Sequence, residues 1–85
     1  MKLYKHDTNH AEIVKTLRAC GWVVIDTSWS RGRLLDLIAY RPNGGLYFVE
    51  VKGPKGKLTA METIFFIKHP ECSRIIHTVD EALKL

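Results

Sequence analysis

The sequence predicts an α/β protein in which helices flank a mixed sheet, in the order α-β-β-β-α-β-α. Two runs, residues 34–40 and 46–52, are apolar almost throughout, which is typical of strands covered on both faces. Segments with apolar residues at helical spacing precede and follow these runs, and turns containing glycine or proline separate them. With 85 residues and no internal repeat, the chain is expected to form one domain, residues 1–85.

The first helix is expected over residues 9–20, because its apolar residues recur at helical spacing and Gly21 suits a C-terminal stop. Residues 22–25, with the sequence Trp-Val-Val-Ile, are expected to form the first strand. A polar loop, residues 26–33, then leads into the first of the two apolar runs.

The two apolar runs are expected to pair as a hairpin, because Arg-Pro-Asn-Gly-Gly between them is strong turn punctuation. The second helix is expected to begin near Thr59 and to end by His69, before Pro70. Two β-branched residues between polar ends predict a short strand over residues 74–77, and residues 78–85 are expected to form a last short helix.

Three charged residues, Asp36, Glu50 and Lys52, lie inside the two apolar runs. A buried carboxylate is costly unless a cation compensates it, and Mg²⁺ prefers one or two carboxylates with water and phosphate oxygens. We therefore expect Asp36 and Glu50 to hold a divalent metal ion, with the backbone carbonyl of Val51 as a third oxygen. Lys52 shares a strand face with Glu50, where its ammonium group would hold an attacking water or stabilise developing phosphate charge. The alternative is an ion pair on the surface, at a strand end.

The metal site constrains the register of the hairpin. A two-residue turn would set Asp36 opposite Val51, with its carboxylate on the wrong side of the sheet. A three-residue loop over residues 42–44 pairs residue 41 with 45 and sets Asp36 opposite Glu50, on a shared face. Such loops favour a glycine with positive φ at their end, which Gly44 supplies, so the sequence predicts this register.

Composition excludes several classes of protein. The apolar fraction of 46% and the charged fraction of 26% are those of a globular chain, and the net charge of +4 favours a polyanionic partner. Cys20 and Cys72 are too few for a disulfide framework and are expected to be reduced core thiols in a cytosolic protein. We expect no signal peptide, and no segment approaches the ~20 apolar residues that span a bilayer.

The residues around the three charges resemble a known nuclease signature. Leu35-Asp36-Leu37-Ile38, followed by Glu50-Val51-Lys52, resembles the motif of the PD-(D/E)XK superfamily. More narrowly, the chain resembles the stand-alone VRR-NUC proteins of phages and bacteria, from the first helix through Gly21-Trp22 and Leu58-Thr59 to residues 79–83. The resemblance covers most of the chain and implies a restriction-endonuclease-like core, α-β-β-β-α-β with a short C-terminal helix.

The same resemblance implies a Mg²⁺- or Mn²⁺-dependent DNA endonuclease that hydrolyses phosphodiester bonds in the cytoplasm of a bacterium or of a phage-infected host cell. Compact relatives are similar to homodimeric Holliday-junction resolvases, so branched DNA such as four-way junctions is the expected substrate. The sequence departs from the family in two places. Leu35 replaces the usual proline of the motif, and Glu62 stands where many relatives carry glutamine.

Two acidic residues have two interpretations each. Glu12 lies where the family often has an additional catalytic acid on the first helix, but Asn9-x-x-Glu12 is also the pattern of a helix capping box. Likewise, Thr59-x-x-Glu62 predicts a capping box, and the alternative is that both residues contact the catalytic side chains and hold them in position.

Basic residues flank the expected site on both sides. Arg31 and Arg33 precede the Asp36 strand, and Lys55 and Lys57 follow Lys52. These side chains are expected to contact DNA phosphates without reading sequence; the alternative is ordinary solvated loop charge. Two other functions stay open at this point: a nucleic-acid-binding module with a nuclease fold but no activity, and a structural subunit whose charges serve assembly.

Overall fold

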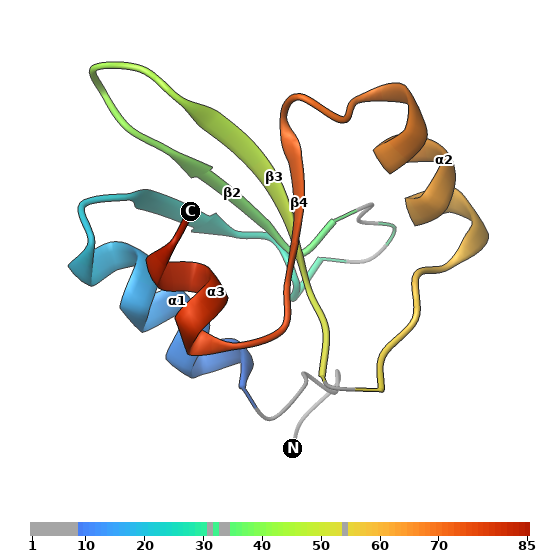
Figure 1. Ribbon diagram of the computed structural model, residues 1–85, viewed down its shortest axis with the longest axis horizontal. Helices are drawn as coiled ribbons and strands as arrows, with labels where there is room; N and C mark the ends of the chain where they lie inside the picture. Colours follow the sequence, from blue (N-terminus) through green and yellow to red (C-terminus); the bar gives the residue numbers. More distant parts are fainter. Residues whose placement is uncertain (1–8, 31, 33–34, 54) are drawn as a thin grey trace.

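The structure is a computed structural model that describes residues 9–30, 32, 35–53 and 55–85. Its helices and strands are α1 (His10–Ala19), β1 (Val23–Asp26), β2 (Leu37–Tyr40), β3 (Leu46–Val51), α2 (Ala60–Lys68), β4 (Ser73–Ile76) and α3 (Val79–Leu83). The order α-β-β-β-α-β-α and the mixed sheet are therefore those that the sequence predicts, and the fold class is confirmed (Figure 1).

The sheet has the strand order β1-β2-β3-β4. Strand β2 pairs antiparallel with both of its neighbours, β1 and β3, whereas β4 lies parallel to β3 after the crossover through α2. The final strand begins at Ser73 and ends at Ile76, one residue earlier at each end than the sequence suggested.

The expectation that the three charges lie inside strands is wrong for two of them. Asp36 immediately precedes β2, and Lys52 immediately follows β3, so only Glu50 is within a strand. Backbone pairing nevertheless continues past the strand ends, because the Asp36 N–H donates to the Val49 carbonyl at 3.2 Å and the Lys52 N–H to the Ile76 carbonyl at 3.1 Å. Both residues are therefore fixed by the sheet.

Helices α1 and α3 lie side by side on one side of the sheet, and α2 lies apart from them beside β4 (Figure 1). The main core forms between α1, α3 and the sheet. Ile13 and Leu17 of α1 and Leu37, Ala39 and Val49 of the sheet are each 0% exposed there. Strand alternation directs the neighbours of these sheet residues to the opposite face, the face of α2.

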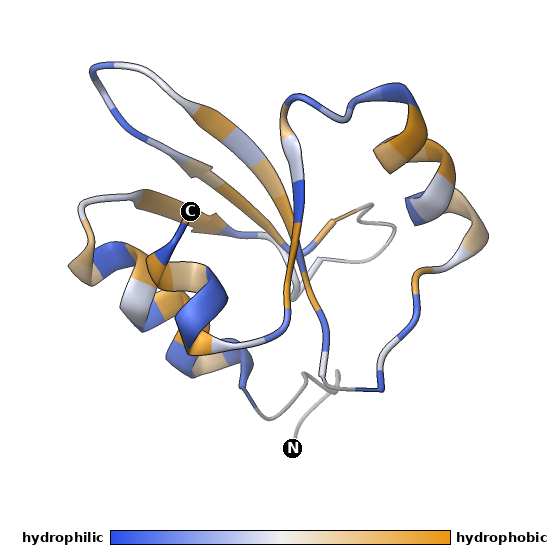
Figure 2. Ribbon diagram, in the orientation of Figure 1, coloured by the Kyte–Doolittle hydropathy of each residue, from blue (hydrophilic) through white to orange (hydrophobic). Residues whose placement is uncertain are grey.

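The face of α2 is much less completely covered. Along most of its length α2 is hydrophobic (Figure 2), yet Glu62 is its only buried residue. The side chains of Val23 and Ile25, on β1, are 40% and 47% exposed. This open apolar face also carries the side chains of Asp36 and Glu50, as the register of the hairpin shows.

Candidate active site

The hairpin between β2 and β3 has the register that the sequence predicts. Leu37 pairs with Val49 and Tyr40 with Leu46, so Asp36 falls opposite Glu50 at the next position. The loop holds three residues, 42–44, because the Arg41 N–H donates to the Gly45 carbonyl at 3.0 Å. Gly44 and Gly45 have φ of 129° and 91°, a backbone conformation open to glycine. The odd register is confirmed, and both carboxylates lie on one face.

Asp36 is buried and held by its neighbours. Its side chain lies in a residue that is 7% exposed, and the Val51 N–H donates to Asp36 Oδ2 at 3.0 Å. The Asp36 backbone carbonyl accepts from the Thr27 N–H at 2.9 Å and from Thr27 Oγ1 at 3.0 Å. The carboxylate is thus oriented by the adjacent strand rather than by solvent.

Glu50 has an unusual environment for an acid. It is 4% exposed; Oε2 lies 3.1 Å from Lys52 Nζ, while Oε1 is buried with no hydrogen-bond partner among the described residues. Burial, the charge of Asp36 and the nearby carboxyl group of Glu62 raise the pKa of Glu50 from 4.5 to about 8. A buried acid with an unpaired oxygen and a raised pKa is a good ligand for a further cation.

Lys52 is the cation at the centre of the cluster. Its Nζ lies 3.1 Å from Glu50 Oε2 and 3.3 Å from Glu62 Oε1. Burial lowers the pKa of Lys52, but the two carboxylates outweigh this effect, so the net shift is upward and the ammonium form is favoured. The side chains of Lys52 and Glu50 are 16% and 5% exposed, so the alternative of a surface ion pair is wrong.

Glu62 forms the capping box of α2 and also contacts Lys52. Its Oε1 accepts from the Thr59 N–H at 2.9 Å, and the Glu62 N–H donates to Thr59 Oγ1 at 3.1 Å, which completes the capping box of α2. The same Oε1 pairs with Lys52. Burial raises the pKa of Glu62, but the hydrogen bond from Thr59 and the interactions with Glu50 and Lys52 lower it overall. Thr59 itself is exposed and supports the site only through this cap.

Of the two interpretations of Glu12, the capping box with Asn9 is wrong. Asn9 precedes α1 without a side-chain cap hydrogen bond, because its amide donates instead to the backbone carbonyls of Lys52, at 3.5 Å, and His77. Asn9 thereby ties the ends of β3 and β4 to the start of α1, a role that the sequence did not reveal. Glu12 is exposed and lines a groove with Val79 of α3.

A second residue that the sequence analysis missed is Gly56. The loop after β3 folds back over Lys52, so that a methyl group at Gly56 would lie 3.0 Å from Lys52 Cβ and 3.1 Å from Cδ. This contact is tighter than most carbon–carbon packing, so a side chain at this position would displace Lys52 by a few tenths of an ångström. A glycine four residues after the expected catalytic lysine is the only signal of it in the sequence.

The structure describes only part of the two loops that carry the basic residues. Lys55 and Lys57 are exposed on the loop that follows Lys52. Arg31 and Arg33 lie outside the described residues. Among the residues that the structure describes, no group of three or more His, Cys, Asp or Glu side chains is placed to hold a metal. Any metal at this site would therefore rest on two carboxylates, a carbonyl and solvent, a set that suits Mg²⁺.

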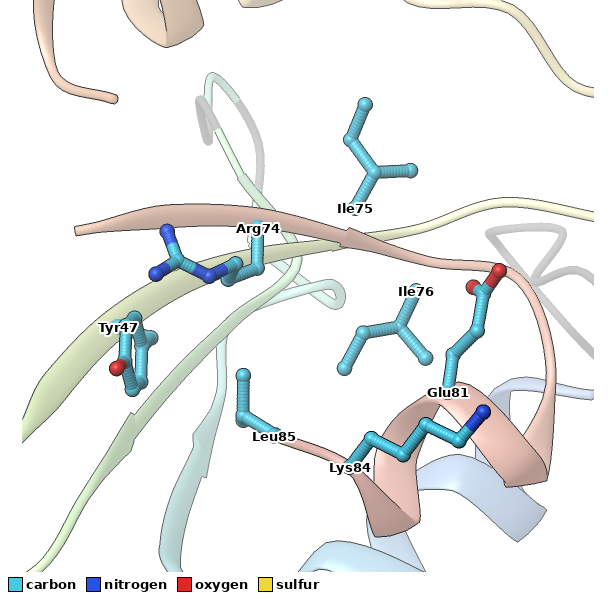
Figure 3. A pocket seen from close by; sticks show the side chains of 7 residues that line it. All are labelled: Tyr47, Arg74, Ile75, Ile76, Glu81, Lys84 and Leu85. Atoms are coloured by element: carbon cyan, nitrogen blue, oxygen red, sulfur yellow. The ribbon is translucent and has the colours of Figure 1, made fainter. Parts of the chain in front are cut away.

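A different cavity lies between α3 and the sheet, on the opposite face. It measures about 240 Å³, and the guanidinium group of Arg74 lies over the ring of Tyr47 at 4.5 Å beside it (Figure 3). Arg74 also donates to the backbone carbonyls of Pro70 and Ser73, at 3.0 and 2.8 Å. Because this arginine is engaged in local packing, the cavity is a weaker functional candidate than the carboxylate cluster.

The sequence matches a known protein family. Residues 11–84 match the family described as "Uncharacterised protein family UPF0102". The chain belongs to the UPF0102 family. That description assigns no activity to UPF0102 proteins, and no curated protein matches this chain.

A solved structure described as "VRR_NUC domain" resembles this UPF0102 protein over nearly its whole length. The similarity has a TM-score of 0.67 and covers 93% of this chain and 95% of the other, at 23% sequence identity. The two proteins therefore share a fold, and the resemblance to PD-(D/E)XK and VRR-NUC proteins is confirmed at that level. Across the described part of the UPF0102 chain, every helix is too short or too polar to cross a membrane.

Proposed function

We propose that this protein is a DNA endonuclease that hydrolyses phosphodiester bonds with Mg²⁺ or Mn²⁺. The observation that carries the proposal is the pair of buried carboxylates, Asp36 and Glu50, with Glu50 Oε1 unpaired among the described residues and one lysine beside them. The fold shared with the solved VRR_NUC domain supports the same class of activity.

The residues present fit a divalent ion. Asp36 and Glu50 would hold it, with the carbonyl of Val51. Burial first, and the charge of Asp36 second, raise the pKa of Glu50, and a bound cation would offset both effects. When bound, such an ion neutralises phosphate charge and lowers the pKa of water. The Val51 N–H keeps Asp36 oriented, so this carboxylate needs no rearrangement on binding.

Lys52 is the proposed catalytic lysine. Glu50 and Glu62 hold its ammonium group charged and directed at the carboxylate pair, where it can donate to the attacking water or to the phosphate oxygens that gain charge. Glu12 enters the proposal as an additional acid, and its exposed position beside α3 argues for a smaller contribution. Glu12→Gln tests that contribution directly.

The proposed DNA contacts come from the loops around the site. Lys55 and Lys57 are exposed shortly after Lys52, and Arg31 and Arg33 precede Asp36 in the sequence. Such lysine and arginine contacts to phosphate are independent of sequence and weaken with salt. They suit an enzyme that recognises the shape of branched DNA, including four-way junctions.

A homodimer is part of the proposal. The outward side of α2 carries Met61, Ile64 and Ile67, which are 66%, 48% and 72% exposed. A helix of nine residues is marginal in water without packing, and a second copy would cover this surface by two-fold symmetry. Two sites in one dimer would cut two strands of a junction. The free thiols of Cys20 and Cys72 support the proposed cytoplasmic location.

The decisive experiment compares a four-way junction, a linear duplex and a single strand, each with Mg²⁺ or EDTA. Metal-dependent cleavage that Lys52→Ala abolishes, with DNA binding retained, supports the enzyme. Tight binding without cleavage at any metal concentration supports the inactive nucleic-acid-binding module instead. If the protein neither binds nor cleaves DNA, the remaining hypothesis is a structural subunit whose charges serve assembly. Light scattering tests the dimer separately, and a monomer at high concentration contradicts paired cutting.

A further inference from the structure

An apolar groove adjoins the carboxylate cluster on the α2 face of the sheet. Its volume is about 370 Å³, and its lining includes one residue of the loop after β1, two residues near Asp36, one of β3 and one of α2. These are Trp29, Leu35, Ile38, Phe48 and Phe65. The groove has eight lining residues, of which three are aromatic, and Thr27, Ser30 and Leu37 complete the set.

The groove is continuous with the proposed site of cleavage. Ile38 pairs with Phe48 across the hairpin, and the next pair on the same face is Asp36 with Glu50. Two residues along a strand span roughly 6.8 Å. A nucleotide whose phosphate lies at the carboxylates can therefore reach the groove with its base.

The aromatic residues of the groove have the geometry of a stacking platform. The rings of Phe48 and Phe65 are 5.5 Å apart, edge to face, and form one wall. Trp29 lines the groove and is 67% exposed, although tryptophan side chains are on average largely buried in folded proteins. An exposed tryptophan beside an apolar groove is a common feature of sites that bind flat ligands.

We propose that this groove binds an unstacked nucleobase of the nucleotide beside the cleaved phosphate. The inference rests on the proposed nuclease function and specifies its substrate: DNA with unpaired bases at the cut, as at branch points or in single strands. Charge favours nucleic acid over an apolar peptide as the occupant, since the chain has a net charge of +4 and Lys55 and Lys57 lie exposed beyond Lys52.

Fluorescence anisotropy in EDTA tests the groove without requiring catalysis. The probe is a labelled oligothymidylate, compared with a duplex of the same length. Trp29→Ala should weaken binding of the single strand about tenfold, the effect of losing about 1.4 kcal/mol of base stacking, and leave duplex binding unchanged. Trp29→Phe should retain most of the affinity, and Leu83→Ala, an exposed residue of α3 on the opposite face, is the matched control.

A strand of abasic nucleotides supplies the second measurement. Without bases, the wild type and Trp29→Ala should bind this strand equally. An equal loss on abasic and ordinary DNA would mean that Trp29 contacts the backbone or maintains the fold, and would overturn the proposal. A change in oligomeric mass on Trp29→Ala would identify a second copy as the occupant, which also overturns it. If oligothymidylate binding depends on Trp29 but no DNA is cleaved, only the nuclease function fails.

Discussion

Replacing Glu50 with glutamine removes an ionisable group from the buried cluster and keeps the shape of the side chain. The pKa of this carboxyl is about 8 in the folded protein, against 4.5 ordinarily, so the metal-free fold holds a proton that the unfolded chain releases. For a group with a raised pKa, the stability it contributes is complete below pH 4.5 and is lost as the pH rises through about 8.

The size of the effect follows from these two pKa values. Each unit between the pH and the unfolded pKa costs about 1.36 kcal/mol, up to the folded pKa. Ionisation in the unfolded chain therefore lowers the free energy of unfolding of the metal-free wild type by about 1.4 kcal/mol at pH 5.5 and by about 5 kcal/mol at pH 8.5. Glu50→Gln carries no such cost. Without metal, the variant should be more stable than the wild type, by a margin that grows on the order of 3 kcal/mol between these two pH values.

Urea unfolding in EDTA at pH 5.5 and 8.5 measures this margin. Glu71→Gln, at an exposed acid, is the matched control and should show no pH-dependent gain. Adding Mg²⁺ should then reverse the order, since it stabilises the wild type in proportion to its affinity and displaces the Glu50 proton, whereas the glutamine variant gains little. Equal stabilities at both pH values, or a glutamine variant that is less stable at pH 8.5, would refute the account of Glu50 as an uncompensated acid.

Three further substitutions test the arrangement around Lys52. Lys52→Ala removes the group that pairs with both acids, and we expect DNA cleavage in Mg²⁺ to slow by about 10²-fold or more; an unchanged rate on a labelled four-way junction would rule out a catalytic lysine. Gly56→Ala places a methyl group 3.0 Å from Lys52 Cβ, so the rate should fall by about 10- to 100-fold while the unfolding free energy changes little. Equal losses of rate and stability would mean that Gly56 serves only the fold. Thr59→Ala removes half of the capping box and should cost ~1 kcal/mol, seen as a lower melting temperature.

The sequence predicted the hairpin register because two considerations agreed. A metal site needs Asp36 and Glu50 on one face of the sheet, which requires a loop with an odd number of residues. Gly44 independently favours the three-residue loop that sets Asp36 opposite Glu50. The order of helices and strands was predictable for a similar reason, since apolar spacing and turn residues point to the same elements throughout.

The errors have a common physical cause. Asn9 and Glu12 satisfy the local pattern of a capping box, but carbonyl groups 43 and 68 residues away compete for the Asn9 amide. The contact of Gly56 with Lys52 likewise depends on the path of a loop in three dimensions. Neither partner is visible in the local sequence, because tertiary hydrogen bonds and close contacts override local preference.

Glu62 Oε1 makes two interactions that link the start of α2 to Lys52. It accepts the hydrogen bond from the Thr59 N–H that caps the helix, and it pairs with the ammonium group of Lys52. Fraying of the first turn of α2 therefore releases the lysine from one of its two anchors at the same moment. Since Glu62 is the only buried residue of α2, this turn has little else to keep it closed. A molecule that packed on α2 and kept this turn closed would therefore also hold Lys52 in position, without contacting it.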